Sequence, residues 1–198
     1  MNGMGLKSIV RRRRPDYVKG TAHKVFANIL NREFSVQKPN LIWATDFTYL
    51  PMADGTMHYN CTIIDLYDRY AVATLNGASI TADLAIRTLE KALRQHKPGK
   101  GLILHSDQGV QFTSKVFNDF CERHHVQQSM SQAGCPYDNA PMERFYKSFK
   151  AELIYPNKFN TEDQLDEAVN RYVHVWYNHI RPHSYNGGLT PFEARNLA

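Results

Sequence analysis

Three acidic residues stand at the ends of segments that look like buried strands or a helix start. Asp46 lies within Leu41–Leu50, a run rich in aromatic and β-branched residues, and Asp107 follows the apolar run Leu102–Leu104. Glu143 comes soon after a proline that fits the first turn of a helix. A lone charge in an apolar strand is costly, so a cation or a metal is expected beside it. Any fold for this chain has to account for these acids together.

Hydrophobic periodicity predicts five strands and several helices. Short apolar or β-branched runs predict strands at Leu41–Leu50, Met57–Leu66, Tyr70–Leu75, Leu102–Leu104 and Val126–Met130. Apolar residues at helical spacing predict helices at Thr81–Gln95, Ser114–Arg123, Asp138 or Asn139 to about Leu153, and Leu165–Trp176. Thr81 and either Asp138 or Asn139 are the expected N-caps, and Ala53–Thr56 is an expected hairpin turn. A short helix is also expected around Lys24–Leu30.

This order of elements predicts an α/β fold. Three antiparallel strands, a helix, a strand, a helix, a strand and further helices match the ribonuclease H-like fold, a central five-stranded mixed sheet flanked by helices. In that topology the first strand lies beside the fourth. Asp46 and Asp107 would then meet at one end of the sheet, with the helix that carries Glu143 packed beside them.

The charge balance favours a polyanionic partner. The chain has 24 Lys and Arg against 19 Asp and Glu, a net charge of +5, and a block of four arginines, Arg11, Arg12, Arg13 and Arg14. Its three cysteines form no C-x-x-C pair, which fits a reducing intracellular setting better than a disulfide framework. No apolar run approaches the roughly 20 residues that span a bilayer. We therefore expect a cytoplasmic protein with no membrane partner.

The three acids fit metal-dependent phosphodiester chemistry. Two divalent cations about 3.5–4 Å apart can activate a nucleophile and stabilise a leaving oxygen, and Mg²⁺ or Mn²⁺ prefers carboxylate ligands. Each acid also has a structural explanation. Asp46 could pair with a cation, Asp107 could belong to a turn, and the helix dipole favours Glu143 in a first turn. Together with their spacing, the metal site is the stronger interpretation.

Several motifs carry a resemblance to one family. The chain resembles the catalytic subunit of insertion-sequence transposases of the DDE type, with a retroviral-integrase catalytic core. In that family 35 residues separate the second aspartate from the glutamate, as they separate Asp107 from Glu143 here. The matching segments, from about residue 24 onward, are Asn31–Phe34, Pro39–Asp46, Leu104–Gly109, Tyr137–Glu143, Phe145–Lys150, Tyr177–Asn178, Arg181–His183 and Leu189–Pro191.

The resemblance implies roles and partners. Asp46, Asp107 and Glu143 would be the catalytic residues and the ligands of Mg²⁺ or Mn²⁺, two ions with DNA bound. The partners would be DNA, as element ends and target, and further copies of the chain on DNA. Family members usually carry a helix-turn-helix in a longer N-terminal region, so a separate helix-turn-helix protein from an upstream reading frame is a candidate partner. The implied setting is the bacterial cytoplasm, with nucleoid association when DNA is bound.

The resemblance also suggests an organisation of the chain and DNA contacts. We expect a basic N-terminal arm or linker at 1–38, an integrase-type core at 39–155 and a helical extension packed on the core at 156–198. Lys147 and Lys150 lie four and seven residues after Glu143, on one helical face, and Arg144 lies on a neighbouring face. These three and the Arg11–Arg14 block are the candidate DNA-backbone contacts, against the alternative of a solvated surface.

Other polar residues have mainly structural interpretations. His105 is expected to be hydrogen-bonded rather than a general base, and Asp65 and Asp68 are expected in pairing and turn roles. Tyr177, Asn178, Arg181 and His183 could contact DNA or brace the C-terminal segment. The favoured function is DNA transposition and integration by metal-dependent strand cleavage and strand transfer. A catalytically inactive DNA-binding remnant and a ribonuclease H-like nuclease remain as alternatives.

Overall fold

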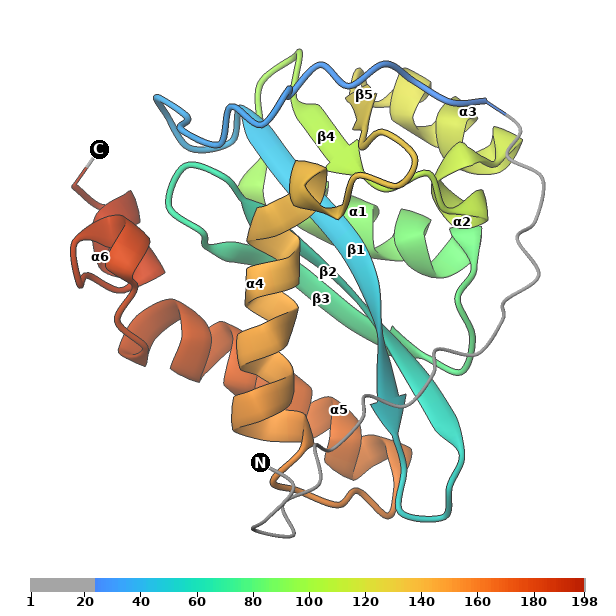
Figure 1. Cartoon of the computed structure of the whole chain (residues 1–198), viewed down its shortest axis with the longest axis vertical. Helices are drawn as coiled ribbons and strands as arrows, with labels where there is room; N and C mark the ends of the chain where they lie inside the picture. The colour runs from blue at the N-terminus through green and yellow to red at the C-terminus, as the bar shows by residue number, and fades with distance from the viewer. Residues whose placement is uncertain (1–23, 198) are drawn as a thin grey trace, which may run out of the picture.

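A five-stranded mixed sheet forms the centre of the chain. The computed structural model describes residues 24–197, apart from the side chain of Pro136. The strands are β1 (Ile42–Pro51), β2 (Met57–Asp65), β3 (Ala71–Gly77), β4 (Ile103–Ser106) and β5 (Gln127–Met130). Their order is β3-β2-β1-β4-β5, with β1 to β3 antiparallel and β1, β4 and β5 parallel (Figure 1). The predicted ribonuclease H-like fold is therefore confirmed.

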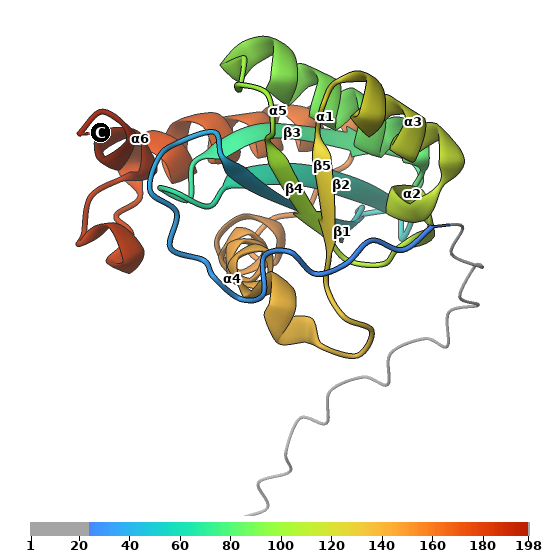
Figure 2. The same ribbon diagram turned by 90° about the horizontal axis from the view of Figure 1, so that it is seen from above.

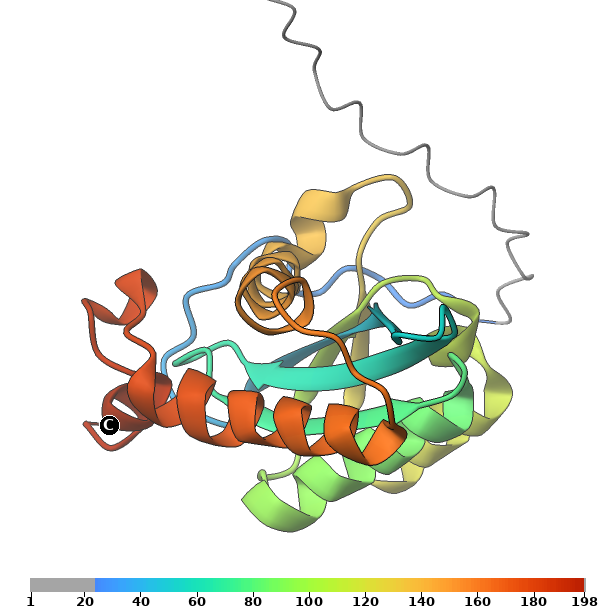
Figure 3. The same ribbon diagram turned by 90° about the horizontal axis from the view of Figure 1, so that it is seen from below.

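Helices cover both faces of this sheet. Figure 2 shows α1 (Ala82–His96) and α3 (Lys115–Arg123) on one face and α4 (Ala140–Phe149) on the other. A wider π-helical turn, η3 (Lys150–Ile154), continues α4. The helix formed by α5 (Glu162–Arg171) and η4 (Tyr172–Ile180) contacts β3 and runs along that side of the sheet (Figure 3). Shorter elements are α2 (Val110–Thr113), η2 (Pro136–Asn139), η5 (Ser184–Asn186) and α6 (Pro191–Arg195).

The alternation of side chains in β1 divides the core in two. Trp43 packs with residues of α1 and α3, whereas Ala44 packs with residues of α4, α5 and η4. Within the second cluster the ring of Phe149 stacks on Phe145 and meets Tyr172 edge to face, which joins α4 to the C-terminal helices. Because successive strand residues point to opposite faces, Asp46 shares the face that α4 covers.

Residues 24–28 have no regular secondary structure and a bend and a turn follow at 29–32, so the helix predicted around Lys24–Leu30 is wrong. Ser129 of β5 accepts hydrogen bonds from the backbone N–H groups of Ile29 and Leu30, and the N–H of Met130 donates to the carbonyl of Ala27. These bonds to a distant strand replace the bonds that a short helix would make within itself. The apolar spacing alone did not contain this information.

Local signals at turns and caps are mostly confirmed. The side chain of Thr81 caps α1 by accepting from Leu84 N–H, and Asp54 with Gly55, at φ +88°, forms the hairpin turn. Asn139, one of the two residues predicted as N-cap of the helix that carries Glu143, occupies that position, but its side chain makes no capping hydrogen bond. Asp138 instead binds the N-terminal segment and the Gln132 backbone. None of the helices between residues 24 and 197 has the length and apolarity of a membrane span.

Candidate active site

Asp46 and Asp107 lie side by side because β1 and β4 are parallel neighbours. The register pairs Ala44 with His105, and two residues further along each strand come Asp46 and Asp107. Asp107 follows the end of β4, where the chain turns away toward α2. The structure thus brings together two residues that lie far apart in the sequence.

The two aspartates form an electrostatically crowded pair. Burial raises the pKa of Asp46, and the charges of Asp107 and Glu143 raise it further. Burial also raises the pKa of Asp107. Each carboxylate accepts one backbone hydrogen bond, Asp46 from Phe47 N–H at 2.7 Å and Asp107 from Gly109 N–H at 2.9 Å. Between residues 24 and 197 no Lys, Arg or His forms an ion pair with either carboxylate, although the charge of Lys150 partly offsets the crowding around Asp46.

Two side chains fix α4 against β1 beside this pair. The Tyr146 hydroxyl donates to the carbonyl of Asp46 at 2.7 Å and accepts from the N–H of Thr62 at 3.0 Å. The Asn139 amide donates to the carbonyl of Thr45 at 3.1 Å. Glu143 lies on the same side of the helix, four residues after Asn139 and three before Tyr146. The side of α4 that carries the exposed Glu143 therefore faces the end of the sheet that carries the two aspartates.

Replacing Tyr146 by Phe should loosen this attachment. The change leaves the buried N–H of Thr62 and the carbonyl of Asp46 without their partner, so we expect a loss of roughly 1–3 kcal/mol in the free energy of unfolding. Chemical denaturation measures the loss. The same change at the exposed Tyr155 should leave stability unaltered. Equal stability of Tyr146→Phe and the parent would show that the hydroxyl does not hold α4.

The donor set fits a hard divalent cation. All three candidate ligands offer carboxylate oxygens, which Mg²⁺ and Mn²⁺ prefer, and a cation would supply the charge that the Asp46–Asp107 pair lacks. Within the described part of the chain, no three acidic, histidine or cysteine side chains lie close enough to form a ready metal cluster. Asp46 and Asp107 thus form the part of the candidate metal site that is already assembled. Glu143 is exposed, but it lies close enough for its charge to raise the pKa of Asp46.

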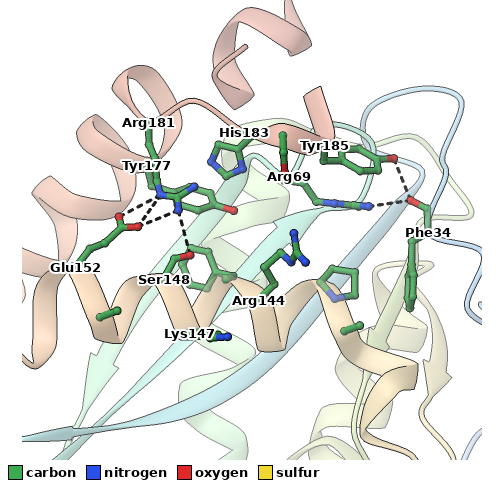
Figure 4. Close-up of a pocket in the computed structure, with 15 residues that line it drawn as sticks. Phe34, Arg69, Arg144, Lys147, Ser148, Glu152, Tyr177, Arg181, His183 and Tyr185 are labelled. Carbon is green, nitrogen blue, oxygen red and sulfur yellow. Dashed lines mark hydrogen bonds and ion pairs between the residues drawn. The ribbon is translucent and has the colours of Figure 1, made fainter. Parts of the chain in front are cut away.

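The candidate DNA contacts on α4 separate into two environments. Lys150 is half-buried and lies close enough to Asp46 that its charge favours the ionised carboxylate. Lys147 and Arg144 are exposed and line a groove on the other side of the helix, between α4 and the C-terminal segment (Figure 4). The four arginines Arg11, Arg12, Arg13 and Arg14 lie outside the described residues.

Several neighbours of the site have structural roles. His105 is buried and hydrogen-bonds to the hydroxyls of Ser129 and Ser131, as predicted, and burial lowers its pKa to about 4. Asp65 and Asp68 pair with Arg195, also as predicted. Sequence reasoning missed Tyr146 and Asn139 as supports of the site. Their spacing around Glu143, one helical turn on each side, is the signal that could have identified them.

Comparison with known proteins establishes the family. The Integrase core domain pattern matches residues 36–136, and a second Integrase core domain pattern matches residues 124–191. The chain belongs to the integrase core domain family. It is 38% identical over 176 residues to Transposase InsF for insertion sequence IS3A of Escherichia coli K12, covering 88% of this chain and 61% of that protein. It therefore spans about three fifths of the length of that relative.

Another relative is similar to this chain in sequence, and two solved structures are similar to it in fold. The insertion element IS600 uncharacterized 31 kDa protein of Shigella sonnei is 35% identical over 84% of this chain and 61% of its own length. The fold resembles the simian T-cell lymphotropic virus intasome in complex with PP2A regulatory subunit B56 gamma, at a TM-score of 0.65 and 16% identity, covering 89% of this chain and 60% of that chain. It also resembles the HTLV-2 integrase catalytic core domain in complex with magnesium (dimeric form). The TM-score is 0.59 and the sequence identity 19%, and the match covers 80% of this chain and 97% of that chain.

Proposed function

We propose that this chain is the catalytic subunit of a transposase, which cleaves DNA strands and joins them to target DNA in a metal-dependent reaction. The observation that carries the proposal is the half-buried Asp46–Asp107 pair, which forms no ion pair with any described Lys, Arg or His, beside the helix of Glu143. Asp46, Asp107 and Glu143 are the proposed catalytic residues and ligands of two Mg²⁺ or Mn²⁺ ions. The similarity to InsF supports the transposase assignment.

The protein's own groups would prepare the site for this chemistry. When bound, the metal ions supply the positive charge that activates the attacking hydroxyl and stabilises the leaving oxygen. Asp46 and Asp107 hold their carboxylates in place through backbone N–H donors, which leaves one oxygen of each without a hydrogen bond in the described structure. Lys150 favours the ionised form of Asp46, and Tyr146 fixes the strand and helix that carry the acids.

The partners follow from the same assignment. We propose DNA, as element ends and target, further copies of the chain assembled on DNA, and a separate helix-turn-helix protein for recognition of the ends. The proposed setting is the bacterial cytoplasm. Residues 1–38 would act as a basic arm, 39–155 as the catalytic core and 156–198 as an extension. The shared core of α4, α5 and η4 supports close packing of this extension on the core.

Divalent cations alone should stabilise the fold slightly and more strongly at higher pH. A cation that binds Asp46 has to displace a proton, because the pKa of Asp46 is raised, so its apparent affinity increases as the pH rises. We expect Mn²⁺ in the millimolar range to raise the melting temperature, and Asp46→Asn to remove the increase. Thermal unfolding at several pH values measures both. An increase that survives in Asp46→Asn would place the cation elsewhere.

The hydrolytic step of the proposed reaction can be tested on a labelled duplex. The duplex should carry the terminal sequence of the element that encodes this chain. We expect a 3′-hydroxyl product with Mg²⁺ or Mn²⁺ and none with a chelator present. Intact duplex under all metal conditions, although the protein binds it, would favour the inactive DNA-binding remnant.

A further inference from the structure

A second groove, separate from the aspartate pair, lies between the outer side of α4 and the C-terminal segment. It has a volume of about 580 Å³ and is lined by residues from four parts of the chain. Arg144 and Lys147 come from α4, Arg69 from the turn between β2 and β3, and His183 from the segment after η4. Figure 4 shows Arg144 and Arg69 pointing toward the same space.

The positive charges in this groove are not balanced. Its one acidic lining residue, Glu152, is already bound by Arg181 at 2.9 Å and by the hydroxyl of Tyr172 at 2.8 Å. Arg144 and Lys147 are both exposed, and their side chains make no ion pair or hydrogen bond with other residues in the range 24–197. The groove thus keeps free cationic groups.

Arg69 adds a half-buried guanidinium. It donates to the carbonyls of Leu66 and Phe34 and stacks on the ring of Tyr185 at 3.7 Å, but no carboxylate within residues 24–197 contacts it. Burial lowers its pKa, and the nearby charges of Asp65 and Asp68 offset this only in part. Stacked arginines held in a fixed orientation are well suited to bind the oxygens of a phosphate.

The groove also holds a buried polar atom without a partner. Nε2 of His183 forms no hydrogen bond with the described residues, although only 9% of the residue is exposed. Burying a polar group in this way is costly unless a ligand or water completes it. The ring of His183 packs edge-on against Tyr177 and lines the groove. A polar ligand in the groove would relieve this cost.

The position of Lys147 links this groove to the acids. At 3.6 residues per turn, Lys147 lies between Glu143 and Arg144 around the circumference of α4. A polyanion that passes Glu143 therefore meets Lys147 and then Arg144 on its way into the groove. The charges of a small anion would reach only one of these positions, whereas a phosphodiester backbone has charges at regular intervals.

We propose that this groove binds the phosphodiester backbone of DNA and guides the duplex around α4, away from the carboxylates. The inference rests on the proposed function, because it takes the substrate of that function as the ligand. It also gives a shared role to the family segments at Phe34 and at Tyr177–His183, which lie on opposite sides of the groove. These contacts would be independent of base sequence.

Charge reversal in the groove provides the test. Duplex DNA is titrated in the presence of a chelator at several salt concentrations, so that binding is measured without chemistry. We expect Arg144→Glu to weaken binding at least about tenfold, the loss expected for one hydrogen bond to a charged group. Arg144→Ala should reduce the magnitude of the salt-dependence slope by about one unit, and Arg144→Lys should retain most of the affinity. Ala151→Glu, which removes no contact, should weaken binding similarly.

A matched control separates the groove from general charge effects. Arg94 is an exposed arginine of α1, on the opposite face of the sheet, so Arg94→Glu should bind DNA nearly as the parent does. Arg144→Glu and Ala151→Glu variants that bind like Arg94→Glu would overturn the inference, even if the parent cleaves and joins DNA. A change in self-association without DNA, with DNA affinity retained, would assign the groove to a second copy and overturn it too. Failure of the proposed function instead appears as bound but unreacted DNA.

Discussion

Asp46→Asn, Asp107→Asn and Glu143→Gln should each abolish strand cleavage and strand joining while the fold persists. Each amide keeps the shape of the carboxylate but loses the charge that holds the metal ions, and metal ions supply several kcal/mol of transition-state stabilisation. A decrease of at least about a thousandfold in rate is therefore expected. Initial rates on a labelled duplex measure it. Near-normal joining by Glu143→Gln would contradict the three-carboxylate site.

The same variants should differ in stability, which serves as the control for folding. The pKa of Asp46 is raised to about 8 in the folded protein, so at pH values above the ordinary aspartate pKa folding has to bind a proton there, which lowers stability. Asp46→Asn should therefore raise the melting temperature at neutral pH without added metal. The increase should shrink as the pH falls toward the ordinary aspartate pKa, where Asp46 of the unfolded chain also becomes protonated. Glu143 is exposed, so Glu143→Gln should change the melting temperature less.

Arg195→Ala should cause the largest loss of stability among substitutions outside the aromatic core. Arg195 of α6 pairs with Asp65 at 2.7 Å and with Asp68 at 2.6 Å, and both aspartate side chains are fully buried. Its guanidinium also lies over the ring of Tyr70 at 4.5 Å. Removing it leaves two buried carboxylates unpaired, which should cost roughly 3–5 kcal/mol of unfolding free energy. Chemical denaturation measures this loss.

The pH dependence and a surface control sharpen this prediction. Without Arg195 the folded pKa of the buried Asp65 rises further, so the loss should be greatest at neutral pH and smaller as the pH falls toward the ordinary aspartate pKa. The exposed Arg87–Asp83 pair of α1 is the control, and Arg87→Ala should change stability little. A similarly small change for Arg195→Ala would show that Arg195 does not neutralise the buried Asp65 and Asp68.

Features that depend on local sequence could be predicted, and those that depend on distant partners could not. The five strands and the cap of α1 follow from apolar runs and from Thr81, whose signals lie within a few residues. The non-helical conformation of 24–30 depends on Ser129, about a hundred residues away. The pairing of Asp65 and Asp68 was expected, but nothing local pointed to Arg195 as the partner.

The candidate site shows the same division. The proximity of Asp46 and Asp107 could be expected only through the topology of the fold, because it depends on the parallel pairing of β1 with β4. The acidic pattern with its spacing identified the three candidates. It could not show that Asp138 binds Arg32 and the Gln132 backbone instead of capping a helix, since both partners come from other segments. The groove beyond α4 was invisible to the sequence because four segments build it.

The most direct test of the central claim is a strand-joining assay. A duplex with the terminal sequence of the element, labelled and ending in a 3′-hydroxyl, is incubated with the chain, supercoiled target DNA and Mg²⁺ or Mn²⁺. The proposed function predicts a covalent product that joins the labelled strand to the target and is absent with Asp107→Asn. Nicked target without joined label would instead identify a ribonuclease H-like nuclease and contradict the assignment as a transposase.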